Sequence, residues 1–493
     1  MAGSENHDSF LDSGNNICPD RAGDIETEMS TRELFIILGY GISGKGAARL
    51  LAKQGIPFFV SDRAPDSISP AEKQWLDSVP AGYGDEPSAI RFMKDNDVTG
   101  VILSPGIAAS NPVITYAAQK NIMVYGELEY ALRQYKGTAI GITGTNGKST
   151  TVQVLKSILC AHGCFAEVAG NIGVAVSAIM AEPVQPDVLA IEISSFQLEY
   201  SSRIQLDGAI VTNITADHCD RYATFADYAA TKSIILERIK ENGFFIAHVR
   251  DMALLKSSQP EEEFARRNCV WIGQHRPKQE VLAVAEDGIR LVCPSLGTSE
   301  LIAARDTIDL KGDHMLENAV MAGQAALLYG AGKMSVAKGI QQFRGLEHRM
   351  EYVGSRDGIG FYNDSKATNI DAAVKALSFF RGNVHIILGG LDKGSDLSPL
   401  QKEIKKRAVS VMLIGDSSDY YEKAFKGSAP LKRCVSMEDA VHSAFKNAKT
   451  GDIVLLAPAC ASFDMYDNFE HRGKHFKSIA NAIIRNEIVS NNT

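Results

Sequence analysis

Two glycine-rich turns, far apart in the sequence, constrain the fold of this chain more than any other feature. Residues 38–46 read LGYGISGKG and residues 140–150 read IGITGTNGKST, and each turn follows an apolar run and precedes a helical pattern. A glycine-rich turn between a strand and a helix can hold phosphate on backbone N–H groups at the start of the helix. The sequence therefore predicts two phosphate sites, each at the edge of a parallel sheet.

Apolar runs and amphipathic segments alternate along most of the 493 residues. This alternation is typical of βαβ units on parallel sheets, and a chain of this length is expected to form about three domains. We expect an α/β protein with three tandem α/β domains. They are a Rossmann-like N-terminal domain over 33–127, a central P-loop ATPase-type parallel-sheet domain over 128–345 and a Rossmann-like C-terminal domain over 346–493. Short strand-like pieces make the pattern less regular over 244–310.

Charge is concentrated at the beginning of the chain. Residues 1–30 contain seven acidic side chains against Arg21 alone, a net charge of −6 out of −8 for the whole protein. This composition predicts that residues 1–32 form a disordered acidic tail, and Met29, just before the first strand-like run, is a candidate start of translation. The nearly neutral remainder argues against a nucleic-acid surface.

The apolar runs and the cysteines indicate a cytoplasmic protein. No apolar run reaches the roughly 18 to 20 residues that a membrane span requires, which predicts a soluble protein without a membrane partner. The eight cysteines include no CxxC pair and no metal-type spacing, as expected for reduced thiols.

The first turn has the GxGxxG pattern, with Gly39, Gly41 and Gly44, and Asp62 ends the next strand-like run. In a dinucleotide-type fold such an acid binds a ribose hydroxyl. The pattern predicts a diphosphate and a ribose but specifies neither the base nor a nicotinamide. A turn that merely packs a helix on a strand is the alternative.

The second turn is more specific for phosphate. Lys148 follows Gly147 and can reach terminal phosphates, and the hydroxyls of Ser149 and Thr150 can meet Mg²⁺. The turn departs from the strict GxxxxGK[ST] pattern, because Ile142 stands where that pattern has glycine. The two turns differ, since only the second is followed by a lysine and hydroxyl residues. They therefore predict two different phosphorylated ligands, one of them ATP.

Several short strings in fixed order resemble the Mur ligase family of peptidoglycan synthesis, and the resemblance extends from about residue 34 to about 480. The strings are SPG, GITGTNGKST, GNIG, EISSFQLE, NITADHCDRY, EHR and NDSKATN. The family uses ATP and Mg²⁺ to phosphorylate a carboxylate, which an amine then attacks. The resemblance implies a cytoplasmic, monomeric ligase. It is greatest to the members that add D-glutamate to UDP-N-acetylmuramoyl-L-alanine.

The resemblance also implies an ATP and Mg²⁺ site. Residues that match the family's ATP contacts are Gly144, Thr145, Asn146, Gly147, Lys148, Ser149, Thr150, Asn318, Arg349 and Asp364. Residues that match its catalytic and metal positions are Lys148, Ser149, Glu192, His218 and Lys232. The family carries a carbamylated lysine at the position of Lys232. Because Arg349 opens the third domain, ATP is expected to lie between the second and third domains.

Two further sets of residues match the family's substrate contacts. For the sugar nucleotide they are Gly41, Ile42, Ser43, Asp62, Arg63, Asn171 and Gln197. For D-glutamate they are Lys366, Thr368, Lys393, Ser462 and Phe469. The string GGLDKG around Lys393 departs from the family's usual glycine-aspartate-glycine-lysine order. The DNPR string of the diaminopimelate-adding members is absent.

Other classes of protein explain less of the sequence. An NAD-dependent oxidoreductase would leave the second turn without a role. A folylpolyglutamate synthetase would share the ATP site but does not need a sugar-nucleotide domain before it. A nucleotide-binding regulatory protein that has lost activity would not need Lys148, Glu192, His218 and Lys232.

Overall fold

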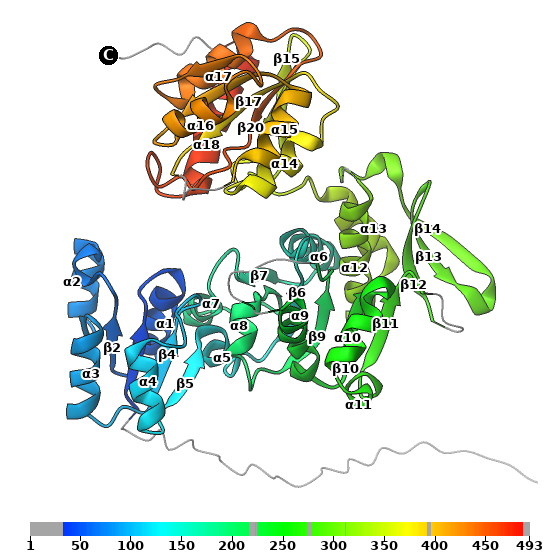
Figure 1. Ribbon diagram of the computed structural model, residues 1–493. Helices are drawn as coiled ribbons and strands as arrows, with labels where there is room; N and C mark the ends of the chain where they lie inside the picture. The colour runs from blue at the N-terminus through cyan, green and yellow to red at the C-terminus, as the bar shows by residue number, and fades with distance from the viewer. Residues whose placement is uncertain are drawn as a thin grey trace, which may run out of the picture.

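The computed structural model describes residues 33–486 apart from 216–221, 223, 275–278, 311 and 392–395. The predicted acidic tail, His218 and Lys393 lie outside the described residues. Three α/β units, each with its own main sheet, follow one another along the chain (Figure 1). The α/β class predicted from the sequence is confirmed, whereas the domain bounds at 127/128 and 345/346 stay a prediction.

The first unit is a five-stranded parallel sheet with strand order β3-β2-β1-β4-β5. Its elements are β1 (Phe35–Leu38), α1 (Ile42–Lys53), β2 (Phe58–Ser61), η1 (Pro65–Ser67), α2 (Pro70–Asp77), β3 (Ala81–Gly84), α3 (Glu86–Asp95), β4 (Gly100–Leu103), α4 (Pro112–Gln119) and β5 (Met123–Gly126). Strands β1 and β4 are buried along their whole length, as expected for a sheet covered on both faces. The first glycine turn joins β1 to α1.

The central unit is a six-stranded parallel sheet with order β11-β10-β9-β6-β8-β7. Its elements are α5 (Glu127–Leu132), β6 (Thr138–Thr143), α6 (Lys148–His162), β7 (Ala166–Gly170), α7 (Val176–Ala181), β8 (Val188–Glu192), α8 (Ser195–Glu199), β9 (Leu206–Val211), α9 (Phe225–Ser233), η2 (Ile234–Arg238), β10 (Ile239–His248), η3 (Val249–Asp251), α10 (Met252–Ser258), α11 (Glu261–Ala265), β11 (Asn268–Ile272), α12 (Asp313–Tyr329) and α13 (Lys333–Gln342). The second glycine turn joins β6, a central strand, to α6.

A small antiparallel sheet accounts for the irregular part of the sequence. Its strands are β12 (Val281–Ala285), β13 (Gly288–Cys293) and β14 (Thr298–Ala304), with η4 (Pro294–Leu296) and η5 (Arg305–Thr307). The strand-like pieces predicted there correspond to β10 through β13, and β14 had no clear signal because its exposed polar half breaks the apolar run. The sheet lies against α12, where Gln324 accepts a hydrogen bond from the N–H of Leu282 at 2.9 Å.

The C-terminal unit is a six-stranded sheet with order β15-β16-β20-β17-β18-β19, in which the β15 edge strand is antiparallel. Its elements are β15 (Glu351–Arg356), β16 (Ile359–Asn363), α14 (Ile370–Ser378), β17 (Val384–Gly389), α15 (Ser398–Arg407), β18 (Ala408–Ile414), α16 (Ser418–Phe425), β19 (Leu431–Arg433), α17 (Met437–Asn447), β20 (Ile453–Leu456) and α18 (Phe469–Arg485). The loops after β16, β17 and β20 meet at one edge of this sheet.

The first two units share a hydrophobic core, whereas the third has cores of its own. One cluster joins Ala47 and Ala48 of α1 to Val176 and Met180 of α7. A Cβ at Gly46 would lie 2.5 Å from Ser177 Oγ, so the close approach of α1 to α7 requires glycine at this position. The two clusters of the C-terminal unit lie on opposite faces of its sheet and contain residues of that unit alone.

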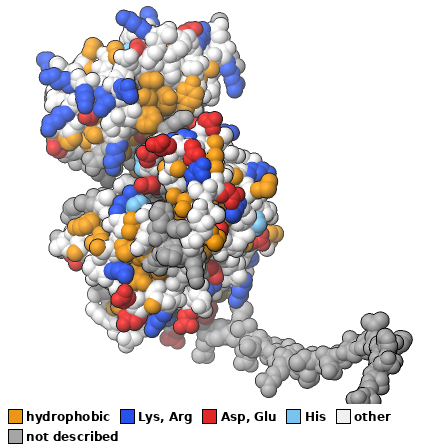
Figure 2. All heavy atoms as spheres, turned by 90° about the vertical axis from the view of Figure 1, so that its right-hand side faces the viewer, with side chains coloured by type: hydrophobic (Ala, Val, Ile, Leu, Met, Phe, Trp, Pro, Cys, Tyr) orange, Lys and Arg blue, Asp and Glu red, His pale blue; other side chains and the backbone are white. Residues whose placement is uncertain are grey.

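Charged side chains of both signs lie on much of the surface that is visible in Figure 2. On the face shown in Figure 2, acidic and basic side chains are mixed over the lower body, and Lys and Arg side chains are numerous on the C-terminal unit at the top. No helix among the described residues combines the length and the apolar character needed to cross a membrane.

Candidate active site

The second glycine turn forms a phosphate-type loop at the start of α6. Gly144 and Gly147 have φ of +139° and +86°, which only glycine adopts readily. The ammonium of Lys148 donates to the carbonyl oxygens of Gly144 and Thr145, both at 2.9 Å, and so lies over the loop. Within the described structure no side chain caps α6, so the N–H groups of its first turn can receive an anion.

The strand next to this loop contributes a carboxylate. Glu192, at the end of β8, accepts a hydrogen bond from Ser149 Oγ at 2.7 Å and one from Asn171 Nδ2 at 2.8 Å. Glu192 and Ser149 are both buried. The backbone N–H of Asn171 also donates to the carbonyl oxygen of Glu192. A carboxylate and a hydroxyl beside a phosphate loop are the oxygen donors that Mg²⁺ prefers.

Residues after β9 and on α12 hold the loop from two further sides. The side chain of Asn213 accepts from the N–H of Asn146 at 3.0 Å and donates to its carbonyl oxygen at 2.9 Å. Asn318 is buried on α12, and a Cβ at Gly147 would lie 2.4 Å from its Oδ1. The predicted ATP residue Asn318 therefore contacts the loop directly.

Lys232 lies in the same neighbourhood on α9. Its side chain is only 2% exposed, and its Nζ lies 4.6 Å from the centroid of the Tyr228 ring. The Tyr228 hydroxyl in turn lies 3.2 Å from Thr145 Oγ1 of the phosphate loop. The structure thus buries a lysine that the sequence pattern alone would have placed in solvent, and connects it to the loop through one tyrosine.

The predicted residues of the third domain gather at the edge where its loops meet. Asp364 ends the β16 segment and accepts from the N–H of Met350 at 3.1 Å. Burial raises the pKa of Asp364 to about 6, against the opposing effects of that N–H and the charges of Arg349 and Lys366. Burial also lowers the pKa of Lys366, and the guanidinium of Arg349 lowers it further. Two cations and one acid therefore converge here.

The pKa of Asp364 predicts a pH-dependent stability that Asp364→Asn removes. Because the folded-state pKa of about 6 exceeds the ordinary 3.8, the folded protein retains its proton longer than the unfolded chain as the pH rises. The contribution of Asp364 to the free energy of unfolding therefore decreases between about pH 4 and pH 6, by about 3 kcal/mol in all. Urea unfolding of the ligand-free protein at pH 4.5 and 7.5 measures about two thirds of this loss, since the rest occurs below pH 4.5, and the decrease should be smaller by that amount in the Asn variant.

Asp357→Asn is the matched control for that measurement, since Asp357 is an exposed acid on the turn between β15 and β16. It should retain the wild-type pH dependence. Equal slopes for Asp364→Asn and the wild type would show that Asp364 does not titrate in this range.

Arg472 holds the loops of the third-domain site together. This buried side chain of α18 donates to Ser365 Oγ at 3.0 Å and to the carbonyl oxygens of Ser365 and Cys460 at 2.9 and 3.0 Å. Ser365 Oγ donates to the carbonyl oxygen of Phe469 at 2.8 Å, and Lys366 Nζ lies 5.8 Å from the Phe469 ring centroid. Loops after β16 and β20, which carry Lys366 and Ser462, are thereby tied to one helix.

The first glycine turn forms a separate site at the start of α1. Gly41 precedes the helix without a side-chain cap, and a Cβ there would meet nothing within 4 Å, so a ligand can approach the backbone. Ile42 is 75% exposed, next to Ser43. Both oxygens of Asp62 accept backbone N–H groups, from Tyr40 at 2.7 Å and Ala64 at 2.9 Å. Asp62 therefore shapes the loop besides its predicted contact with ribose.

The structure brings together most of the predicted residues. One group lies at the edge of the central sheet and consists of the ATP loop with Glu192, Asn171, Lys232 and Asn318. A second group lies at the edge of the C-terminal sheet and consists of Arg349, Asp364, Lys366, Ser462 and Phe469. Thr368 and Arg63 are exposed beside their sites. The Oε1 atom of Gln197 accepts from the N–H and hydroxyl of Ser194 at the start of α8.

Sequence reasoning missed three residues of these sites. Tyr228 stands four positions before Lys232 on one helix, a spacing that places both on one face and was available as a signal. Arg472 likewise stands three positions after Phe469. Asn213 opens the string NITADHCDRY, which was a signal, but its contact with Asn146 joins loops far apart in sequence and could not be read from that string.

Comparisons with known proteins identify the class of the chain. Three family models match in order: Mur ligase MurD-like, N-terminal domain, at 33–126; Mur ligase middle domain at 142–326; and Mur ligase, glutamate ligase domain, at 348–460. The chain is also similar to curated proteins along nearly its whole length, as the next paragraph describes. It belongs to the Mur ligase family.

Two similar proteins have the same name. A protein of Koribacter versatilis is 36% identical over 461 residues, which cover 92% of this chain and 98% of that protein. One of Nitrosococcus oceani is 34% identical over 457 residues, 91% of this chain and 96% of that protein. Both are named UDP-N-acetylmuramoylalanine–D-glutamate ligase.

Solved structures share the fold at low identity. The UDP-N-acetylmuramate-alanine ligase MurC of Thermotoga maritima aligns with a TM-score of 0.55 at 16% identity, over 91% of this chain and 99% of that one. MurF of the same organism, solved with ADP, aligns with a TM-score of 0.53 at 16% identity, over 80% of this chain and 92% of that one. These likenesses support the three-domain α/β architecture.

Proposed function

We propose that this protein is an ATP-dependent ligase that joins D-glutamate to UDP-N-acetylmuramoyl-L-alanine in the cytoplasm, as a step of peptidoglycan precursor synthesis. The observation that carries this proposal is the contact of Ser149 with Glu192 beside the phosphate loop, over which the Lys148 ammonium lies, because these groups suit Mg²⁺ and a triphosphate. The curated relatives supply the identity of the substrates. The separate glycine turn at Gly41 supports a second, unconsumed nucleotide.

The reaction forms one amide bond and cleaves one phosphoanhydride bond of ATP, and the displaced carboxylate oxygen leaves with the inorganic phosphate. A carboxylate oxygen of the alanyl group attacks the γ-phosphorus of ATP, and ADP leaves with the electron pair of the broken P–O bond. The amine of D-glutamate then attacks the acyl carbon, loses a proton and displaces inorganic phosphate. Because neither step needs a protein nucleophile, the protein must chiefly position the reactants and neutralise charge.

The central domain supplies the charge and the N–H groups for the triphosphate. The first-turn N–H groups of α6 and the glycine loop would receive phosphate oxygens, and the ammonium of Lys148 would exchange its carbonyl partners for the terminal phosphates. Asn318 packs against the loop and would contact the adenine. Arg349 and Asp364 of the third domain would meet the phosphate and ribose.

The donor set at Glu192 fits magnesium. Ser149 and Glu192 bring a hydroxyl and a carboxylate within 2.7 Å of each other, and both are hard oxygen donors. Magnesium bound there would draw charge from the phosphate oxygens. Among the described residues no cluster of three His, Cys, Asp or Glu side chains is arranged for a metal, so further ligands would come from His218, outside the described residues, and from a carbamate on Lys232.

The remaining roles are assigned to the two outer domains. Gly41, Ile42, Ser43, Asp62 and Arg63 would hold the uridine diphosphate, with Asn171 and Gln197 nearer to the reacting carboxylate. Lys366, Thr368, Ser462 and Phe469, together with Lys393, would hold D-glutamate. A cationic pocket suits an amino acid with two carboxylates.

Release of ADP with a panel of amino acids tests this function. The purified protein is given ATP, Mg²⁺ and UDP-N-acetylmuramoyl-L-alanine with D-glutamate, L-glutamate, L-alanine or diaminopimelate. We expect release above background with D-glutamate alone, together with one equivalent of phosphate. Release with another amino acid would reassign the substrate, and release with none would overturn the proposed function.

A further inference from the structure

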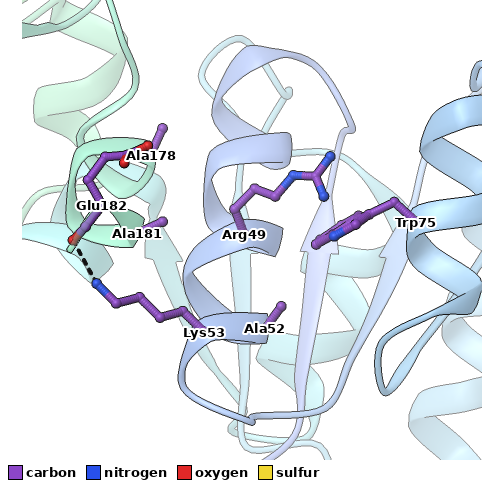
Figure 3. Close-up of a pocket in the computed structure, with 7 residues that line it drawn as sticks. All are labelled: Arg49, Ala52, Lys53, Trp75, Ala178, Ala181 and Glu182. Atoms are coloured by element: carbon purple, nitrogen blue, oxygen red, sulfur yellow. Dashed lines mark hydrogen bonds between the residues drawn. The ribbon is translucent and has the colours of Figure 1, made fainter.

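A chain of polar contacts ties the first glycine loop to helix α2. Tyr40, the second residue of the GYG turn, donates its hydroxyl to Glu72 Oε2 at 2.8 Å. Glu72 also accepts from Arg49 Nη2 of α1 at 3.2 and 3.3 Å. The Arg49 guanidinium in turn lies 3.3 Å from the centroid of the Trp75 ring. Figure 3 shows the two side chains facing each other. One carboxylate therefore joins the loop to both helices.

Hydrogen bonds hold both the backbone and the side chain of Tyr40. Its side chain is 6% exposed, and its backbone N–H donates to Asp62 Oδ2 at 2.7 Å. The preceding Gly39 has φ of +88°, and a Cβ at Gly44 would lie 1.9 Å from the Gly39 carbonyl oxygen, so the backbone of the turn is tightly constrained. Burial and the contact with Glu72 raise the pKa of Tyr40, which keeps its hydroxyl a donor at neutral pH.

The two cations that line the adjoining pocket both contact groups of the protein. The pocket has a volume of about 490 Å³ and is lined by Arg49, Lys53 and Trp75 of the first domain and by Glu182 after α7, among others (Figure 3). The ammonium of Lys53 donates to the carbonyl oxygens of Met180 and Glu182, at 3.2 and 2.7 Å. The charge of Arg49 is paired with Glu72. Through Glu72, the Arg49 side chain is therefore connected to Tyr40 of the loop.

We propose that Tyr40 and Glu72 are positioning residues for the sugar-nucleotide site. They hold the turn so that the N–H groups from Gly41 onward face the diphosphate, and neither side chain touches the ligand. The geometry supports this role because Tyr40 directly precedes Gly41, while its own side chain points away to α2. This inference rests on the proposed function for the identity of the nucleotide.

Tyr40→Phe tests the proposal in the full-length protein, since it removes one hydroxyl and keeps the buried ring. We expect the KM for UDP-N-acetylmuramoyl-L-alanine to rise about tenfold, equivalent to about 1.4 kcal/mol, because the lost hydrogen bond has a charged acceptor. The kcat and the KM values for ATP and D-glutamate should stay at the wild-type level. A general loss of structure would not produce this division between constants.

Three more variants make the test specific. Glu72→Ala should raise the same KM at least as much as Tyr40→Phe, because it also removes the partner of Arg49, and the double variant should raise it no further than Glu72→Ala, because the Tyr40–Glu72 contact is already broken. Glu72→Gln keeps an acceptor for the Tyr40 hydroxyl and should recover most of the affinity. Gln74→Ala, at an exposed position of the same helix, is the control and should resemble the wild type.

An unchanged KM for the sugar nucleotide in Tyr40→Phe would overturn the proposal. So would additive effects of Tyr40→Phe and Glu72→Ala, or an equal change in all three KM values. If the wild-type protein itself releases no ADP, the proposed function fails. Wild-type turnover with an unaffected Tyr40→Phe would defeat the positioning role alone.

Discussion

Lys148→Ala should abolish ADP release while leaving the binding of UDP-N-acetylmuramoyl-L-alanine close to normal. The Lys148 ammonium lies over the loop of residues 144–147, where the terminal phosphates of ATP would be held, and its loss removes the charge that stabilises phosphoryl transfer there. We expect turnover to decrease about a thousandfold. The sugar nucleotide would bind at Gly41, on a different domain. ADP release and calorimetric titration of the sugar nucleotide measure the two effects.

Lys156→Ala is the matched control for this variant. Lys156 lies on the same helix, two turns further on, and pairs with Glu167 of β7 at 2.7 Å, away from the loop. It should retain turnover. Equal loss of ATP turnover and of sugar-nucleotide affinity in Lys148→Ala would contradict the assignment of the two nucleotides to separate domains.

Glu192→Gln should lower kcat by a factor of about a hundred or more and shift the magnesium requirement to higher concentration. The carboxylate of Glu192 accepts from both Ser149 and Asn171, whereas an amide has one acceptor oxygen and no negative charge. The metal would therefore lose a charged oxygen donor, and one of the two hydrogen bonds would break. Titration of activity with Mg²⁺ at saturating ATP measures both consequences.

Glu167→Gln serves as the control, because Glu167 also lies in this sheet but pairs with Lys156 instead of facing the loop. Its magnesium titration should overlay that of the wild type. A Glu192→Gln protein with reduced kcat but an unshifted titration would show that Glu192 positions Ser149 and Asn171 without holding the metal.

The strand–turn–helix units were predictable from sequence because local signals suffice for them. Gly39, Gly144 and Gly147 adopt positive φ at the turns where the sequence placed them, and the apolar runs before them are buried strands. Helix α9 begins after Thr224 and changes to a 3₁₀ turn after Ser233. No residue pattern marks that change.

Contacts between distant segments could not be predicted in the same way. The burial of Lys232 depends on Tyr228 and the surrounding sheet, and its charged side chain gives no hint of this environment. The Tyr40–Glu72 bond joins residues whose approach depends on how α2 packs beside α1. Such pairs become visible only when the helices have been placed in three dimensions.

The glycine at position 46 has a consequence for any attempt to exchange parts among related ligases. Helices α1 and α7 approach closely there, and their apolar side chains form one cluster. Separating the first domain from the second would therefore expose a hydrophobic surface on both fragments. The hydrophobic clusters of the C-terminal domain contain residues of that domain alone. A chimaera that exchanges this domain to change the amino-acid preference should therefore be joined near residue 345.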